Sequence, residues 1–162
     1  MSLLGGRRSA PPDPLQLDAR RILLASEGRP ISAEAVDFVA ALASRTGAVV
    51  YVFSIARIWG TGLGLPMPGL LPSRREWDEQ HDIVGKAVKT LRARGVDAQG
   101  RVLGTRRAAK RIAGEAERLE CDAVVMTADP SRAWLVADFM WSQEPQRVRR
   151  RSRLPVYLVG AD

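Results

Sequence analysis

Two short polar segments follow apolar runs in this sequence, and both carry side chains that could contact a ligand. The first run is Ile22-Leu23-Leu24-Ala25, and the second is Ala123-Val124-Val125-Met126. In an open parallel sheet, the loops that leave the carboxyl ends of central strands form the binding crevice. We therefore predict a ligand pocket at these strand ends, with the candidate residues Ser26, Glu27, Gly28, Thr127, Ala128, Asp129, Ser131 and Arg132.

The residue types in this predicted pocket favour binding over catalysis. Ser131 and Arg132 could contact an anion. Glu27 and Asp129 are the two carboxylates that a hydrolase could use, and each also has a simple explanation as a turn or capping residue. We predict no catalytic residue and no enzyme activity.

The single histidine and the single cysteine do not indicate a metal site or a nucleophile. His81 lies on an apolar stripe with no metal-ligating partners near it in sequence, which favours a packed, hydrogen-bonded residue. Cys121 is flanked by Glu120 and Asp122, which raise a thiol pKa instead of lowering it. We expect an inert structural thiol and no bound metal.

The segments that must position these residues alternate between two types. Short runs rich in Val, Ile, Tyr and Phe predict buried strands, and apolar residues at helical spacing predict helices between them. Ser32, a Ser73–Glu76 capping box and Thr105 are expected to open helices. Such alternation predicts an α/β fold with a parallel sheet covered on both faces. The expected strands lie at residues 22–25, 48–55, 96–103, 123–126 and 154–159.

One glycine-rich segment could be mistaken for a phosphate loop. Gly60-Thr61-Gly62-Leu63-Gly64 has suitable composition, but a phosphate loop needs a helix directly behind it. Pro66, Pro68 and Pro72 follow instead. We interpret residues 56–72 as a long mobile loop.

Length and composition limit the architecture. A chain of 162 residues with 46% hydrophobic and 27% charged residues suits one globular domain. Residues 1–19 are rich in Gly and Pro and predict a flexible tail, which leaves residues 20–162 as the domain. One cysteine fits a reducing cytoplasm, and no apolar run has the length of a membrane span. We expect a cytoplasmic protein without a membrane partner.

The formal net charge is +7, which raises the question of nucleic-acid binding. The basic residues cluster at 106–111 and 147–153, both on segments expected to be amphipathic. No helix-turn-helix, zinc-finger or aromatic stacking pattern accompanies these clusters. We interpret them as solvated helix faces and do not expect a nucleic-acid partner.

The order of these motifs resembles the universal stress protein family over residues 20–159. Ala25-Ser26-Glu27-Gly28-Arg29 stands where the family has a Val-Asp-Gly-Ser type turn. Arg94-Gly95-Val96, Cys121 to Met126 and Pro155 to Val159 match its later motifs in order and spacing. The resemblance implies a single-domain three-layer sandwich with a five-stranded parallel sheet in the order 3-2-1-4-5. It also implies a homodimer that pairs through the last strand.

The nucleotide-binding branch of that family carries Gly, two residues, Gly, nine residues, Gly and then Ser or Thr. Here Thr127, Pro130 and Met140 (or Trp141, shifted by one) stand in place of the three glycines. The resemblance adds Ser142, which stands in place of the motif's Ser or Thr, to the remnant ligand pocket as a residue that could still contact an anion. Glycines let the backbone approach phosphates, and proline has no N–H to donate. We therefore expect ATP binding to be lost or weak, and no cofactor.

The resemblance and the altered loop together suggest a non-enzymatic stress-response module. It would act through dimerisation and contacts with protein partners. The alternative is an adenine-nucleotide (ATP) switch that uses a remodelled loop over residues 127–142. Near that loop, Trp134, Phe139, Met140 and Trp141 are interpreted as core or an oligomer interface.

Overall fold

The computed structural model describes residues 16–57, 72–128 and 144–160, in which strands and helices alternate strictly. The expected loop at residues 56–72 starts too early, because Ala56 and Arg57 still belong to the second strand. Its residues 58–71 and the aromatic run at 134–141 lie outside the described residues. The elements are β1 (Arg21–Ser26), α1 (Ala33–Thr46), β2 (Val49–Arg57), α2 (Arg74–Ala93), β3 (Ala98–Thr105), α3 (Ala108–Arg118), β4 (Ala123–Ala128), α4 (Glu144–Arg151) and β5 (Val156–Gly160).

The five strands form one parallel sheet in the order β3-β2-β1-β4-β5. Ala25 of β1 is in register with Phe53 of β2 on one side and with Met126 of β4 on the other. The central strand β1 is buried along almost its whole length, as an apolar strand covered on both faces should be. The predicted fold class and strand order are confirmed.

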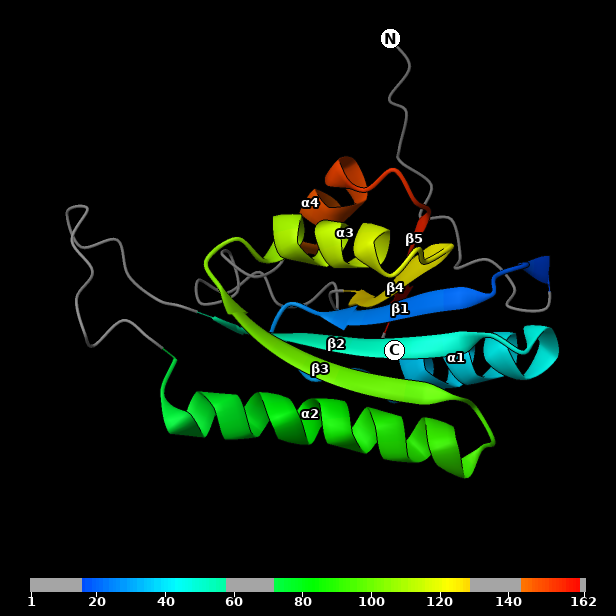
Figure 1. The fold of residues 1–162 in the computed structure, drawn as a ribbon, viewed down its shortest axis with the longest axis horizontal. Coiled ribbons are helices and arrows are strands. Elements are labelled where there is room, and N and C mark those ends of the chain that lie inside the picture. Colours follow the sequence, from blue (N-terminus) through cyan, green and yellow to red (C-terminus); the bar gives the residue numbers. More distant parts are fainter. Residues whose placement is uncertain (1–15, 58–71, 129–143, 161–162) are drawn as a thin grey trace, which may run out of the picture.

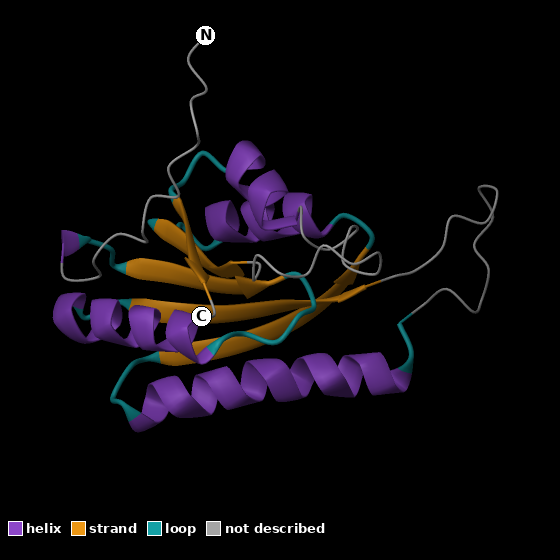
Figure 2. Cartoon of the chain, turned by 180° about the vertical axis from the view of Figure 1, so that it is seen from behind, coloured by secondary structure: helices purple, strands orange, loops and turns teal. Residues whose placement is uncertain are grey.

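Helices cover both faces of the sheet (Figure 1). In this view α3 and α4 lie side by side above the sheet, whereas α2 runs below β3. Seen from behind, α1 lies on the same side of the sheet as α2 (Figure 2). The chain is therefore a three-layer sandwich with α1 and α2 in one layer and α3 and α4 in the other.

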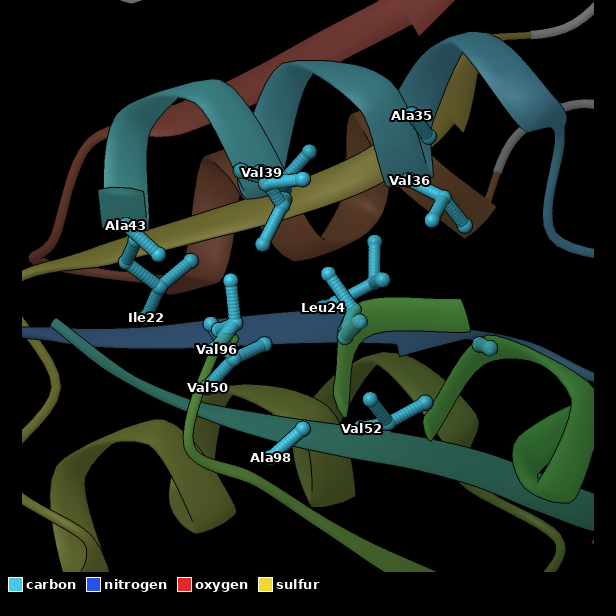
Figure 3. Packing of buried hydrophobic residues seen from close by; sticks show 14 of the residues in the cluster. Ile22, Leu24, Ala35, Val36, Val39, Ala43, Val50, Val52, Val96 and Ala98 are labelled. Carbon is cyan, nitrogen blue, oxygen red and sulfur yellow. The ribbon is translucent and has the colours of Figure 1, made fainter. Parts of the chain in front are cut away.

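Alternation along the strands divides the core into two clusters. Ile22 and Leu24 of β1 point toward α1, where they meet Val36, Val39 and Ala43 (Figure 3). Leu23 and Ala25 point to the opposite face, against apolar residues of α3 and α4 that include Ile112 and Val148. Outside the regular elements, Leu17 packs against the first cluster and Ala19 is buried in it.

Most of the expected helix ends are confirmed. The Ser32 hydroxyl accepts a hydrogen bond from the Ala35 N–H, and Gly47 ends α1 in the left-handed conformation. Ser73 and Glu76 form the expected reciprocal capping box. The third strand begins at Ala98 and not at Val96, because the Val96 N–H still closes the end of α2 by donating to Leu91.

The prediction that Thr105 caps α3 is wrong. Thr105 is the last residue of β3, and its hydroxyl accepts a hydrogen bond from the Arg107 N–H at 3.1 Å. The helix begins only at Ala108, and the residue at its N-cap position, Arg107, makes no side-chain cap. The Thr105 side chain therefore stabilises the turn before α3, and the basic residue Arg107 occupies the N-cap position.

Candidate functional site

The predicted pocket residues that the structure describes lie at the carboxyl ends of two adjacent strands. Ser26 ends β1, with Glu27 and Gly28 directly after it, and Thr127 and Ala128 end β4. Because β1 lies between β2 and β4, the chain leaves these two strand ends at a switch point of the sheet. The remaining predicted members, Asp129, Ser131, Arg132 and Ser142, lie outside the described residues. That any of these residues binds a ligand stays a prediction.

A tight turn follows β1, and the Ser26 hydroxyl makes two hydrogen bonds within it. The Ser26 hydroxyl donates to the Arg29 backbone oxygen and accepts from the Gly28 N–H at 3.1 Å. Gly28 has a φ of 115°, which only glycine adopts without strain. The sequence motif Ser-Glu-Gly-Arg thus forms a self-contained turn whose serine faces its own backbone.

Glu27 is buried, at 2% exposure, and its carboxylate forms an ion pair with the Arg29 guanidinium. Arg57, from the end of β2, donates from Nε to the Glu27 backbone oxygen at 3.0 Å. A buried carboxylate needs such a partner, because an unpaired charge in this position would cost several kcal/mol. The Glu27 carboxylate is therefore already engaged within the protein.

Two polar residues that were not predicted from the sequence hold α2 to this turn. The Gln80 side chain donates to the Gly28 backbone oxygen at 3.0 Å and accepts from the Ser54 hydroxyl at 2.5 Å. Ser54 is fully buried and Gln80 is 7% exposed. Ser54 interrupts an otherwise apolar strand, and Gln80 stands at an inward helical position between Trp77 and Val84. A polar residue within an apolar strand and another within an apolar helix face were the features of the sequence that could have indicated this contact.

Thr127 connects β4 to the start of α1. Its Oγ1 accepts a hydrogen bond from the Ser32 N–H at 3.0 Å and lies 3.4 Å from the Ser32 hydroxyl. The threonine at the first glycine position therefore binds the N-cap of a helix within the protein. A glycine there would leave that N–H open to another acceptor.

His81 does not belong to this site. Its side chain is exposed and stacks on Trp77, with 6.2 Å between ring centroids. The expectation of a packed histidine is wrong, because the inward position is taken one residue earlier by Gln80, which has polar partners there.

Cys121 is buried, and desolvation together with Asp122 raises the pKa of its thiol to about 11. A thiol with this pKa stays protonated at neutral pH, so the structure supports the structural interpretation. Within residues 16–57, 72–128 and 144–160, no three His, Cys, Asp or Glu side chains group as a metal site would require. In the same part of the chain, no helix has the length and apolar composition to cross a membrane.

The universal stress protein family model matches residues 19–160. The chain belongs to the universal stress protein family. Comparison with curated proteins gave no significant match. The family resemblance drawn from the motif order is therefore confirmed.

Solved structures of other family members share this fold. The universal stress protein UspA from Lactobacillus plantarum aligns with a TM-score of 0.69 and 14% identity, over 88% of this chain and 99% of that chain. A universal stress protein from Archaeoglobus fulgidus in complex with dAMP aligns at 0.63 and 18%, over 88% and 99%. A family member from Arabidopsis thaliana with AMP bound aligns at 0.57 and 11%, over 88% and 92%. At such identities the likeness shows the fold alone.

Proposed function

We propose that this chain is a non-enzymatic, cytoplasmic regulatory module of the stress-response type that has lost, or greatly weakened, adenine-nucleotide binding. It acts through dimerisation and contacts with protein partners. The observation that carries the proposal is that polar groups at the switch point already bind one another. Glu27 is buried against Arg29, the Ser26 hydroxyl is used by its own turn, and Thr127 holds the α1 N-cap.

The glycine substitutions act in the same direction. Thr127, Pro130 and Met140 replace the residues that would bring free backbone N–H groups close to phosphates. A nucleotide would have to break the Glu27–Arg29 pair or the Ser32–Thr127 hydrogen bond to reach the strand ends. Each of those groups would then need a new polar partner from the ligand.

Dimerisation through β5 is the second part of the proposal. Within the described sheet β5 pairs only with β4, so its other edge carries unpaired backbone groups. Tyr157 and Leu158 are only half-buried beside that edge. A second copy that pairs along β5 would provide partners for these backbone groups and would bury Tyr157 and Leu158. Light scattering would then give twice the monomer mass of 17.7 kDa.

The alternative is an adenine-nucleotide switch. Two observations favour it: relatives of the same fold were solved with dAMP and AMP, and two guanidinium groups, those of Arg29 and Arg57, lie at the switch point. Positive charge at the carboxyl ends of parallel strands suits phosphate groups. A loop over residues 127–142 would then have to supply the remaining contacts.

Nucleotide extraction and a thermal shift separate the two candidates. The purified protein is denatured, and the released small molecules are analysed by mass spectrometry. The folded protein is melted with and without about 5 mM Mg-ATP. We expect an empty extract and an unchanged Tm. A Kd near 10 μM would instead stabilise the protein by about 4 kcal/mol under these conditions.

A stoichiometric adenine nucleotide in the extract, or a rise in Tm of several degrees, would contradict the loss of binding and establish the switch. The A. fulgidus relative, melted with dAMP under the same conditions, is the positive control. Its shift shows that the assay detects binding in this fold.

A further inference from the structure

The net positive charge of this chain comes from two segments of the sequence. Residues 99–121 and 144–154 contain eleven Lys and Arg against four Asp and Glu, a net charge of +7, which equals that of the whole chain. The rest of the sequence contains fourteen of each sign and is neutral. These two segments, distant in sequence, supply α3, most of β3 and α4, and the two helices pack against each other (Figure 1).

A groove runs between α3 and β3 on this side of the sheet. It has a volume of about 470 Å³, and five cationic side chains line it together with one carboxylate. We call it the α3–β3 groove. Its charged lining residues are Arg101, Arg107, Lys110, Arg111, Glu115 and Arg118.

The one carboxylate of the groove is already neutralised. Glu115 is 3% exposed, and its oxygens accept hydrogen bonds from Arg118 at 2.5 and 3.1 Å and from Arg101 at 2.9 Å. It fixes the two arginines beside each other at the groove wall. In the described part of the chain, no carboxylate pairs with Arg107, Lys110 or Arg111. The groove therefore presents an excess of four positive charges.

A smaller hollow of about 160 Å³ continues from the groove onto the sheet and shares Arg101, Glu115 and Arg118 with it. Tyr51 of β2 lines this hollow and is half-buried. An aromatic ring thus lies next to the arginines, although it is fifty residues away from Arg101 in sequence. Tyr51 thus supplies beside Arg101 and Arg118 an aromatic ring that residues 99–121 do not contain.

Contrary to the expectation from the sequence, we propose that the α3–β3 groove binds single-stranded nucleic acid. Arg107, Lys110 and Arg111 contact consecutive phosphates, and a base stacks on Tyr51. Arginine, which makes up ten of the eleven cations of this layer, presents a planar fork that matches phosphate oxygens. A basic groove with an aromatic platform is the usual design of proteins that bind single strands. An acidic peptide would use the charges but not the ring.

The test is fluorescence anisotropy with a labelled single-stranded RNA of about 20 nucleotides and the full chain. We expect a dissociation constant in the micromolar range at 50 mM salt. Contacts to three to five phosphates predict a log–log salt slope of about −2 to −3.5. The double variant Arg107→Glu/Lys110→Glu should weaken binding by tenfold or more. Tyr51→Leu, which keeps an apolar side chain in the hollow, should weaken it by about fivefold or more.

The matched control is Lys86→Glu/Lys89→Glu on α2, in the opposite layer. It makes the same change in net charge with side chains that are equally exposed. We expect it to change the dissociation constant by less than threefold. Circular dichroism and the melting temperature confirm that each variant is folded.

Four outcomes would overturn the proposal. The first is no binding at 50 mM salt, and the second is an equal loss in both double variants, which would indicate a response to net charge alone. The third is displacement of the RNA by polyglutamate as effective as that by unlabelled RNA. This third result would indicate an acidic protein partner. The fourth is unchanged binding by Tyr51→Leu, which would indicate a contact made by charge alone.

Discussion

At the scale of single residues, the buried acids of this protein are held by arginines. Glu27 pairs with Arg29 at the switch point, and Glu115 pairs with Arg101 and Arg118 at the α3–β3 groove. Both carboxylates are at most 3% exposed, whereas the arginines of Glu115 are about half-exposed. At the groove, the long side chains of Arg101 and Arg118 reach water while the Glu115 carboxylate stays inside, whereas Arg29 is itself largely buried with Glu27.

The Glu115 cluster yields a prediction for stability and its pH dependence. Hydrogen bonds from Arg118 lower the pKa of Glu115 below its ordinary value of 4.5, against the opposing effect of burial. A lowered folded-state pKa means that the stabilisation is complete above the unfolded pKa and disappears as the pH falls through the folded one. Glu115→Gln should therefore cost about 1–2 kcal/mol at pH 7, because the arginines are partly screened by water.

Thermal unfolding of the wild type and of Glu115→Gln at pH 7 and at pH 3 measures this effect. We expect a difference in Tm of roughly 3–6 °C at pH 7 that shrinks as the pH falls below about 4.5. Glu117→Gln, on the exposed side of the same helix, is the control and should change little at either pH. A Glu115→Gln difference that is independent of pH would exclude an ionic origin.

At the scale of elements, the contact between α2 and β3 depends on a residue without a side chain. A Cβ on Gly100 would lie 2.5 Å from Val84 Cγ1 and 3.1 Å from Val88 Cγ2. Gly100→Ala should therefore push α2 away from the strand and destabilise the fold by about 1–3 kcal/mol. Gly85→Ala on the same helix meets nothing within 4 Å and should stabilise by about 0.5–1 kcal/mol.

Urea unfolding of the two glycine variants gives the comparison. Adding Val84→Ala to Gly100→Ala removes the closest methyl groups and should recover part of the loss, although Val84→Ala alone is destabilising. Stabilisation by Gly100→Ala, or additivity of the two changes, would contradict close packing between these elements.

Sequence reasoning was most successful where one segment contains the whole signal. Ser32, Gly47 and the Ser73–Glu76 box are local, so the ends of α1 and the start of α2 could be read directly. The Ser54–Gln80 hydrogen bond joins β2 and α2, and the position of this helix on the strand is set only when the helix packs on the sheet. Thr105 failed as a cap because its hydroxyl had an equally good acceptor role in the turn before α3.

The candidate site shows the same division. The positions of Ser26 and Thr127 at adjacent strand ends follow from the topology that the motif order implies. The partners that occupy them, Arg29 and Ser32, depend on side-chain geometry that alternation and spacing do not encode. The proximity of Tyr51 to the basic helix α3 likewise required the fold.

At the scale of the whole molecule, the layers differ in charge, and this asymmetry can be measured without any ligand. Residues 99–121 and 144–154, which include α3 and α4, carry a net charge of +7, so an anionic surface should bind the protein on this side. Arg149→Glu/Arg150→Glu on α4 and Lys86→Glu/Lys89→Glu on α2 both lower the net charge from +7 to +3. All four side chains are exposed.

Two proteins of equal net charge should therefore separate on a cation-exchange column. The α4 variant loses charge from the layer that contacts the resin and should elute at clearly lower salt than the α2 variant, which should elute closer to the wild type. The order follows from patch charge, because screening over about 10 Å at 0.1 M salt hides the far layer from the resin. Coelution of the two variants would mean that retention depends on net charge alone. The two layers would then not differ in their electrostatic attraction to the resin.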